Sequence, residues 1–285
     1  MKRKITILTI AFLSSVLMCA NAFAAATGRC GDSITWTLDD SGNLTLSGSG
    51  EMWNNGYDDS PFKDYEIRKA TVKYGITSIG ESAFLGCRGM TELTLPNSVT
   101  SIGDCAFYGC TGLTELILPN SVSSIGDIAF TYCSGLEKIT VESGNSCYDS
   151  RDNCNSIIDT EFNTLIVGCK NSVIPNSVTS IGYYAFYGCS GLTELTLPDS
   201  VASIGDGAFI CCSDLSKITS LAEIPPMCGS GVFDRVNKTN CELIVPEGSV
   251  AAYKQAEVWN EFSNISGFSG VEVTVAGKTR KIVVE

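Results

Sequence analysis

Cysteines and carboxylates are the residues of this sequence that could carry chemistry, because the chain contains no histidine. It has 14 cysteines, 31 acidic residues and 19 basic residues among 285 positions. The absence of imidazole excludes a Ser-His-Asp triad, a Cys-His dyad and the commonest zinc, copper and non-haem iron sites. The sequence contains no C-x-x-C pair, the spacing that is typical of thiolate zinc sites. The composition therefore disfavours an enzyme, and we predict no catalytic residue, no metal site and no cofactor.

Residues 1–24 have the organisation of a signal peptide. Residues 2–4 are basic, residues 5–19 are apolar, and 22–24 read Ala-Phe-Ala, the pattern that signal peptidase recognises. The apolar run is shorter than the roughly 20 residues that a membrane span needs. We expect export with cleavage before Ala25, and no membrane insertion afterwards.

The mature chain of 261 residues would keep 16 basic and 31 acidic residues, a net charge of −15 that repels nucleic acid. It would also keep 13 cysteines, an odd number that excludes a framework made only of disulfides. An acidic exported chain is expected to meet proteins, sugars or cations.

An internal repeat governs the rest of the sequence. Ser-Ile-Gly begins at positions 78, 101, 124, 180 and 203, with spacings of 23, 23, 56 and 23 residues. Each copy is followed by Ala-Phe-x-x-Cys and then by a segment that resembles L-x-x-L-x-L. A 23-residue unit cannot bury its own apolar anchors, whereas stacked units can. The pattern predicts a mostly β repeat solenoid with two short strands and a turn of helix in each unit.

Aspartate occupies the first position of three of the five predicted turns of helix. Asp104, Asp127 and Asp206 occupy this position and suit N-caps, because a carboxylate oxygen can accept from the first free N–H groups of a helix. A calcium ladder is the alternative, but Glu81 and Tyr183 interrupt the set.

One cysteine per unit recurs at a fixed offset. The column consists of Cys87, Cys110, Cys133, Cys189 and Cys212. Free cysteine packs as a small hydrophobe, so we predict a reduced, buried ladder. Zinc is the alternative, but thiolates spread along a stack do not form a tetrahedron. Cys105 and Cys211 fall outside the column.

The interval of 56 residues contains one unit plus an insert at about 142–171. Its segments 156–159 and 164–167 flank a turn, which predicts a hairpin. Cys147, Cys154 and Cys169 lie in the insert and allow a local disulfide without specifying the pair.

Both ends of a solenoid need caps. Alternating apolar residues at 34–38 and 44–46 predict a hairpin at the front, and a strand at 243–245 followed by Ser249 as an N-cap predicts a short helix at the back. Cys228 and Cys241 allow a second bridge. The predicted parts are a signal peptide at 1–24, an N-terminal β cap at 25–75, the repeat array at 76–220, a C-terminal cap at 221–267 and a tail at 268–285.

The units Ser101–Cys110 and Leu113–Val122 resemble the BspA-like leucine-rich repeat family of bacterial surface proteins. Segments Gly28–Trp36 and Leu243–Tyr253 are similar to the regions that flank such arrays, and Tyr148–Cys154 is similar to an enlarged repeat. The resemblance implies a right-handed, capped solenoid that is exported and used for recognition. It further implies adhesin-like binding in some members and no catalytic residues.

Residues between the leucines of an L-x-x-L-x-L strand face outward and form columns across neighbouring strands. One column consists of Glu92, Glu115, Lys138, Glu194 and Lys217, and the column beside it of Thr94, Ile117, Thr140, Thr196 and Thr219. A generic solvated face is the simpler interpretation. The functional hypothesis is a protein-binding surface on the concave side that suits a basic partner, with Ile117 as its anchor.

Three classes of function follow. The first is a secreted or cell-surface recognition module that binds host matrix or bacterial surface proteins. The second is a structural envelope or matrix component without a specific ligand. The third is a glycan-active enzyme using Glu92 and Glu115, which adjacent strands would bring to about 5 Å. A repeating column of exposed acids is a poor catalytic cleft, so we expect a monomeric recognition protein and no enzyme.

Overall fold

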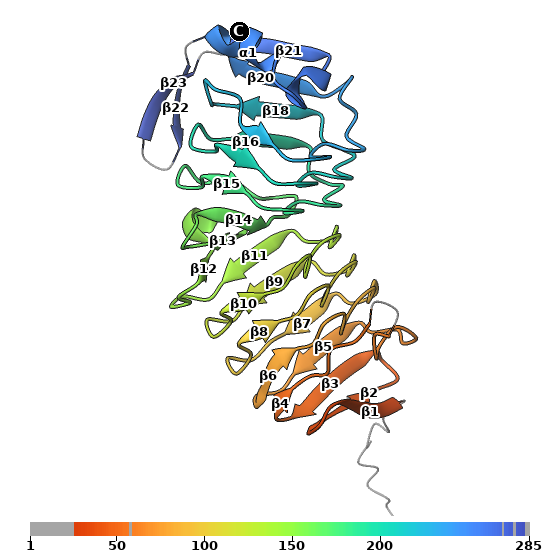
Figure 1. Ribbon diagram of the computed structural model, residues 1–285. Helices are drawn as coiled ribbons and strands as arrows, with labels where there is room; N and C mark the ends of the chain where they lie inside the picture. Colours follow the sequence, from red (N-terminus) through yellow and green to blue (C-terminus); the bar gives the residue numbers. More distant parts are fainter. Residues whose placement is uncertain (1–25, 57–58, 270, 276–277, 283–285) are drawn as a thin grey trace, which may run out of the picture.

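The structure, a computed structural model, describes residues 26–56, 59–269, 271–275 and 278–282, the last two ranges as backbone only. Figure 1 shows an elongated stack of short coils that extends from the N-terminal to the C-terminal region. Equivalent strands of successive repeats pair in parallel, which confirms the predicted solenoid. The predicted signal peptide lies outside the described residues.

Two rows of strands run along the stack (Figure 1). The first row, from the leucine segments, comprises β3 (Asn43–Gly48), β5 (Lys69–Val72), β7 (Glu92–Thr94), β9 (Glu115–Leu118), β11 (Lys138–Val141), β16 (Glu194–Leu197), β18 (Lys217–Ser220), β20 (Glu242–Pro246) and β21 (Asn264–Phe268). The second row comprises β4 (Gly50–Glu51), β6 (Ile76–Ile79), β8 (Ser101–Ile102), β10 (Ser124–Ile125), β12 (Tyr148–Asp149), β13 (Ile157–Asp159), β14 (Thr164–Val167), β15 (Ser180–Ile181), β17 (Ser203–Ile204) and β19 (Met227–Cys228). In β9 exposed and buried residues alternate, so its leucines face the interior.

Turns form the third side of each coil. Where the sequence predicts a turn of helix, the structure has consecutive tight turns, such as the one closed by the Tyr108 N–H donating to the Cys105 carbonyl. Other amides bond along the stack: the Phe107 N–H donates to the carbonyl of Ala129 in the next coil at 2.8 Å. Cys105 has a φ of +53°, which interrupts a helical path and turns these amides toward the neighbouring coil.

The polar residues predicted as N-caps do not cap helices. Asp104 Oδ1 accepts from the Asp127 N–H at 2.8 Å, and Asp206 Oδ1 accepts from the Ser230 N–H at 2.7 Å. The prediction is wrong because no helix follows these aspartates, while an amide of the next coil lies within reach. Ser249 precedes α1 (Val250–Tyr253) but makes no side-chain cap bond, because a 3-10 turn, η2 (Glu247–Ser249), already leads into the helix.

Stacked phenylalanine rings fill the interior. The ring centroids of Phe84 and Phe107 lie 5.1 Å apart with planes inclined by 9°, and those of Phe107 and Phe130 lie 5.2 Å apart at 6°. A second ladder consists of Phe186, Phe209 and Phe233. The Phe107 ring is fully buried and has a ring neighbour on each side. Each coil therefore buries its apolar surface against the next.

The enlarged coil interrupts this stacking. Within the described residues no ring contact joins Phe130 to Phe186, and the buried apolar residues form one cluster in each half of the molecule. A 3-10 turn, η1 (Arg151–Asn153), and the antiparallel hairpin of β13 and β14 occupy the insert, and β14 pairs in parallel with β15. A cavity of about 170 Å³ lies at the junction.

Both ends differ from the repeats. At the N-terminal end, β1 (Ala26–Gly31), β2 (Ile34–Leu38) and β3 pair antiparallel. At the C-terminal end, α1 and η3 (Trp259–Glu261) contribute Tyr253 and Trp259, which are fully buried. The region predicted as a tail contains an antiparallel hairpin of β22 (Val271–Val275) and β23 (Lys278–Ile282).

The predicted cysteine column lies in the interior. Its five members, Cys87, Cys110, Cys133, Cys189 and Cys212, are buried and free. Cys110 Sγ donates to the Phe84 carbonyl and Cys133 Sγ to the Phe107 carbonyl, each at 3.2 Å. Burial raises the pKa of Cys212 to about 12, so this thiol is protonated at neutral pH.

No disulfide joins the cysteines of the described residues, so the bridges that the sequence allows in the insert and in the C-terminal cap are absent. The sulfurs of Cys154, Cys169, Cys228 and Cys241 instead lie 3.4 to 3.9 Å from backbone carbonyl oxygens. Cys147 is half-buried and contacts the Ser146 hydroxyl. These thiols are used as weak donors and packing groups.

Removing a ring from the ladder should destabilise the whole stack. Phe107→Ala deletes a fully buried ring and leaves a cavity, so we expect a loss of about 3–5 kcal/mol in the free energy of unfolding, measured by urea titration. The control is Tyr74→Ala, at a ring that is 79% exposed, which should change stability by no more than about 0.5 kcal/mol. Equal effects of the two variants would contradict the ladder.

Alkaline pH should also destabilise the fold. Burial raises the pKa of Cys30, Cys87, Cys212 and Cys228 from 9.0 to about 12. Between these values the unfolded chain loses thiol protons that the folded chain keeps, so the stabilisation is complete below pH 9 and declines as pH rises toward 12. Urea titrations under reducing conditions should show a falling free energy of unfolding from pH 8 to pH 10, with a shallower fall in Cys212→Ala. A constant free energy over that range would refute this.

Candidate functional site

The residues predicted to bind a partner lie on the outward side of the first strand row, which we call the strand face. Along the stack its charged column consists of Lys69, Glu92, Glu115, Lys138, Glu194, Lys217 and Glu242, in which parallel pairing joins Lys69 to Glu92, Glu115 to Lys138, and Lys217 to both Glu194 and Glu242. The neighbouring column is Thr71, Thr94, Ile117, Thr140, Thr196, Thr219 and Ile244. The insert separates β11 from β16, so the predicted residues fall into two patches, one on each half of the stack.

Lysines neutralise the acids of the N-terminal patch. Lys69 Nζ lies 2.8 Å from Glu92 Oε2, and Lys138 Nζ lies 2.6 Å from Glu115 Oε1. All four side chains are exposed, and such surface pairs contribute about 0–1 kcal/mol each. The patch therefore has basic ends and an acidic centre, whereas the sequence predicts an acidic strip. The difference arises because Lys69 belongs to the N-terminal cap and lies outside the repeat pattern.

Ile117 is the apolar centre of this patch. Its side chain is 48% exposed, while Leu116 and Leu118 on either side of it are buried. Thr140 lies opposite Ile117 on β11. Ile117 is therefore an exposed apolar side chain within an otherwise polar strand face.

The carboxylates of Glu92 and Glu115, which the sequence offers as an alternative glycosidase pair, are both engaged in ion pairs. Each accepts an ion pair from a lysine on an adjacent strand, and both lie on an open sheet.

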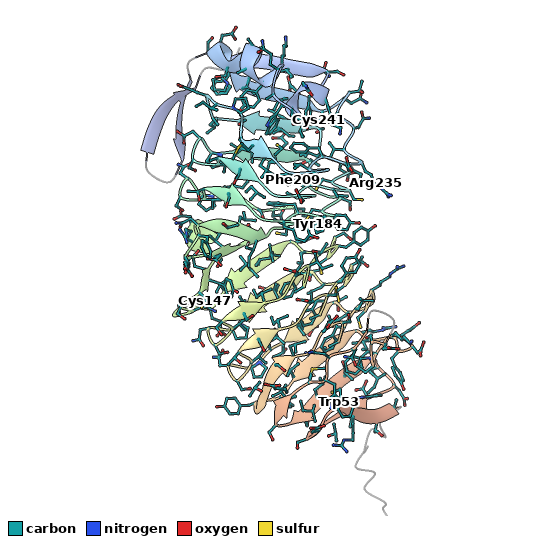
Figure 2. All side chains as sticks on the ribbon, in the orientation of Figure 1. Trp53, Cys147, Tyr184, Phe209, Arg235 and Cys241 are labelled. Carbon is teal, nitrogen blue, oxygen red and sulfur yellow. The ribbon has the colours of Figure 1, made fainter. Side chains whose placement is uncertain are left out.

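A cluster of aromatic residues that the sequence pattern does not predict lies on the side of the stack formed by the turns. We call it the tyrosine groove. A cavity of about 390 Å³ there is lined by Tyr108, Ile128, Thr131, Tyr184, Tyr187, Ile210, Asp234 and Arg235. Figure 2 shows Tyr184 and Arg235 at the same edge of the stack. One signal was available: Tyr108 and Tyr187 occupy the first variable position after Ala-Phe in their units.

Two further findings limit the possible sites. Among the residues that the structure describes, no group of three or more acidic or cysteine side chains is arranged to hold a metal ion. Over the same residues, no helix combines the length and the apolar character required to cross a membrane.

The chain is similar to solved leucine-rich repeat structures. A leucine-rich repeat protein from Eubacterium ventriosum is 25% identical over 79% of this chain and 76% of that chain, with a TM-score of 0.48. A leucine-rich cell surface protein from Faecalibacterium prausnitzii is 18% identical over 85% of this chain and 94% of that chain, with a TM-score of 0.52. No curated protein matches the chain.

The repeat array also matches a known sequence family. Residues 57–164 and 155–248 match the BspA type leucine-rich repeat region, in six copies. These ranges contain the Ser-Ile-Gly repeats, the insert and the first part of the C-terminal cap. The chain therefore belongs to the BspA-type leucine-rich repeat family.

Proposed function

We propose that the protein is an exported, adhesin-like recognition module that binds an extracellular protein of a host or of another bacterium through the strand face. The observation that carries the proposal is Ile117, a half-exposed isoleucine at the centre of the ordered N-terminal patch. The parallel pairing of β9 with β11 and the packing of β7 beside β9 support it, because a rigid surface loses little conformational entropy on binding.

An extracellular location is supported by three observations. The chain belongs to a family of leucine-rich repeat proteins, its fold is shared with a protein described as a cell surface protein, and residues 1–24 have the pattern of a signal peptide. A non-enzymatic role is supported by the paired carboxylates of the strand face and by the absence of histidine.

The charge pattern of the N-terminal patch favours a partner with a complementary pattern over a uniformly basic one. Lys69 and Lys138 enclose Glu92 and Glu115 along the column, so the ends of the N-terminal patch are basic and its centre is acidic. Charge patterns of this kind determine register and association rate more than affinity, which leaves Ile117 as the main source of binding energy.

A structural role through self-association is the second candidate. Ile224 is 82% exposed and lies in the loop before β19, and Met227, the first residue of β19, is 75% exposed. Exposed apolar groups of this size promote contacts between copies.

Binding through the strand face is tested by capture of secreted bacterial proteins and purified matrix proteins on immobilised residues 25–285. Ile117→Asp should abolish capture, because a buried carboxylate would lack a partner at the interface. The matched control is Ile224→Asp, which places the same charge at an exposed isoleucine outside the strand face and should leave capture intact.

Sedimentation of the same proteins separates the two candidates. The recognition role predicts a monomer whose capture depends on Ile117. The structural role would replace the recognition role if the wild type captured no protein and sedimented as an oligomer that Ile224→Asp converts to a monomer.

A further inference from the structure

We propose that the tyrosine groove binds a neutral oligosaccharide, a function separate from protein binding on the strand face. The lining comes from five successive turn segments, beginning with that of Tyr108 and ending with that of Arg235. The phenylalanine rings beneath these turns repeat every 5.1 to 5.4 Å. The groove therefore extends about 20 Å along the stack, which suits an elongated chain of sugars.

Tyrosine rings supply the apolar faces that a pyranose ring requires. Tyr132 borders the groove, with its ring centroid 6.3 Å from that of Tyr108 and 5.7 Å from that of Tyr187, and the rings of Tyr184 and Tyr187 lie 5.4 Å apart. Tyr132 remains 40% exposed. Such rings pack against the C–H surface of a sugar while their hydroxyl groups reach its polar edge.

Asp234 and Arg235 supply the polar wall of the groove. Both are exposed, and neither side chain makes a hydrogen bond or an ion pair with any residue that the structure describes. A carboxylate accepts from sugar hydroxyls and a guanidinium donates to them, and charged partners make the stronger hydrogen bonds. Adjacent opposite charges favour a neutral ligand over an ionic one.

The backbone of the groove is strained where large side chains enter it. The lining residues Ile128, Tyr184 and Arg235 have φ values of 50°, 51° and 65°, and Tyr132, which packs beside the lining, has a φ of 62°. Equivalent positions elsewhere in the stack carry smaller residues, namely Gly86, Gly109, Gly188, Gly207, Gly231, Ser82, Cys105 and Cys211. A β-branched or bulky residue in this region is an outlier, and strain of this kind concentrates at functional sites.

Two glycines hold the tyrosines in place. A Cβ at Gly188 would lie 2.3 Å from the Tyr132 ring, and a Cβ at Gly207 would lie 2.0 Å from the Tyr184 ring. Both rings therefore lie directly against backbone. Rings fixed in this way need little ordering when a ligand binds.

Other ligands fit less well. The Tyr132 N–H donates to the Tyr187 carbonyl at 2.9 Å and the Cys211 N–H to the Asp234 carbonyl at 3.0 Å, so an extended peptide finds these backbone groups already paired. An apolar helix would bury two charged side chains without partners. The net charge of −12 repels nucleic acid.

The experiment titrates the mature chain with cellohexaose, maltohexaose and N-acetylchitohexaose, using saturation-transfer NMR and calorimetry. At least one hexasaccharide should bind. Arg235→Gly removes the guanidinium and inserts the residue that this φ favours, so the melting temperature should be kept or raised while affinity falls about tenfold or more. Tyr187→Ala should weaken binding in the same direction.

Two controls make the outcome specific. Cys211→Gly changes the equivalent left-handed position of the preceding coil, which does not line the groove, and should leave affinity unchanged. Ile117→Asp should also leave it unchanged, which separates this site from the strand face. The absence of saturation transfer from all three sugars at millimolar concentration, or equal affinity of wild type and Arg235→Gly, would overturn the proposal.

Discussion

Stacking of one coil on the next is the constraint on which the rest of the structure depends. A single coil contributes a few residues to each strand and one aromatic ring to the interior, which is too little apolar surface to bury itself. The rings of Phe84, Phe107 and Phe130 repeat at about the spacing of neighbouring strands, so backbone pairing and ring stacking satisfy the same geometry. Inward positions must therefore repeat, whereas outward positions are free to vary and to acquire function.

The sequence period was sufficient to predict the parts that stacking determines. It identifies the leucines that face inward, the strands that carry Glu115 and Ile117, and the enlarged coil. The local form of the turns was not predictable from it, because the left-handed backbone at Cys105 and Ile128 carries no glycine to indicate it. The hydrogen bond that the Asp104 carboxylate accepts was also not predictable from one unit, because its donor, the Asp127 N–H, belongs to the next unit.

Each candidate site likewise depends on features that the repeat predicts or on features that arise outside the repeat. The strand face follows from the alternation within one strand, but its charge balance depends on Lys69, which lies outside the repeat. The tyrosine groove depends on the path of the insert, which brings Tyr132 against Tyr187 across more than two units of sequence. The enlarged coil thus interrupts the interior and assembles a surface that a regular array would lack.

The central claim is that coil-to-coil stacking stabilises two halves that meet at an interrupted interior. Native-state hydrogen exchange followed by mass spectrometry tests it most directly. The account predicts slow exchange in the turn segments of Phe107 and Phe209, whose rings are stacked on both sides, and faster exchange in those of Phe130 and Phe186 beside the insert. Equal or slower exchange in the two segments beside the insert would contradict it.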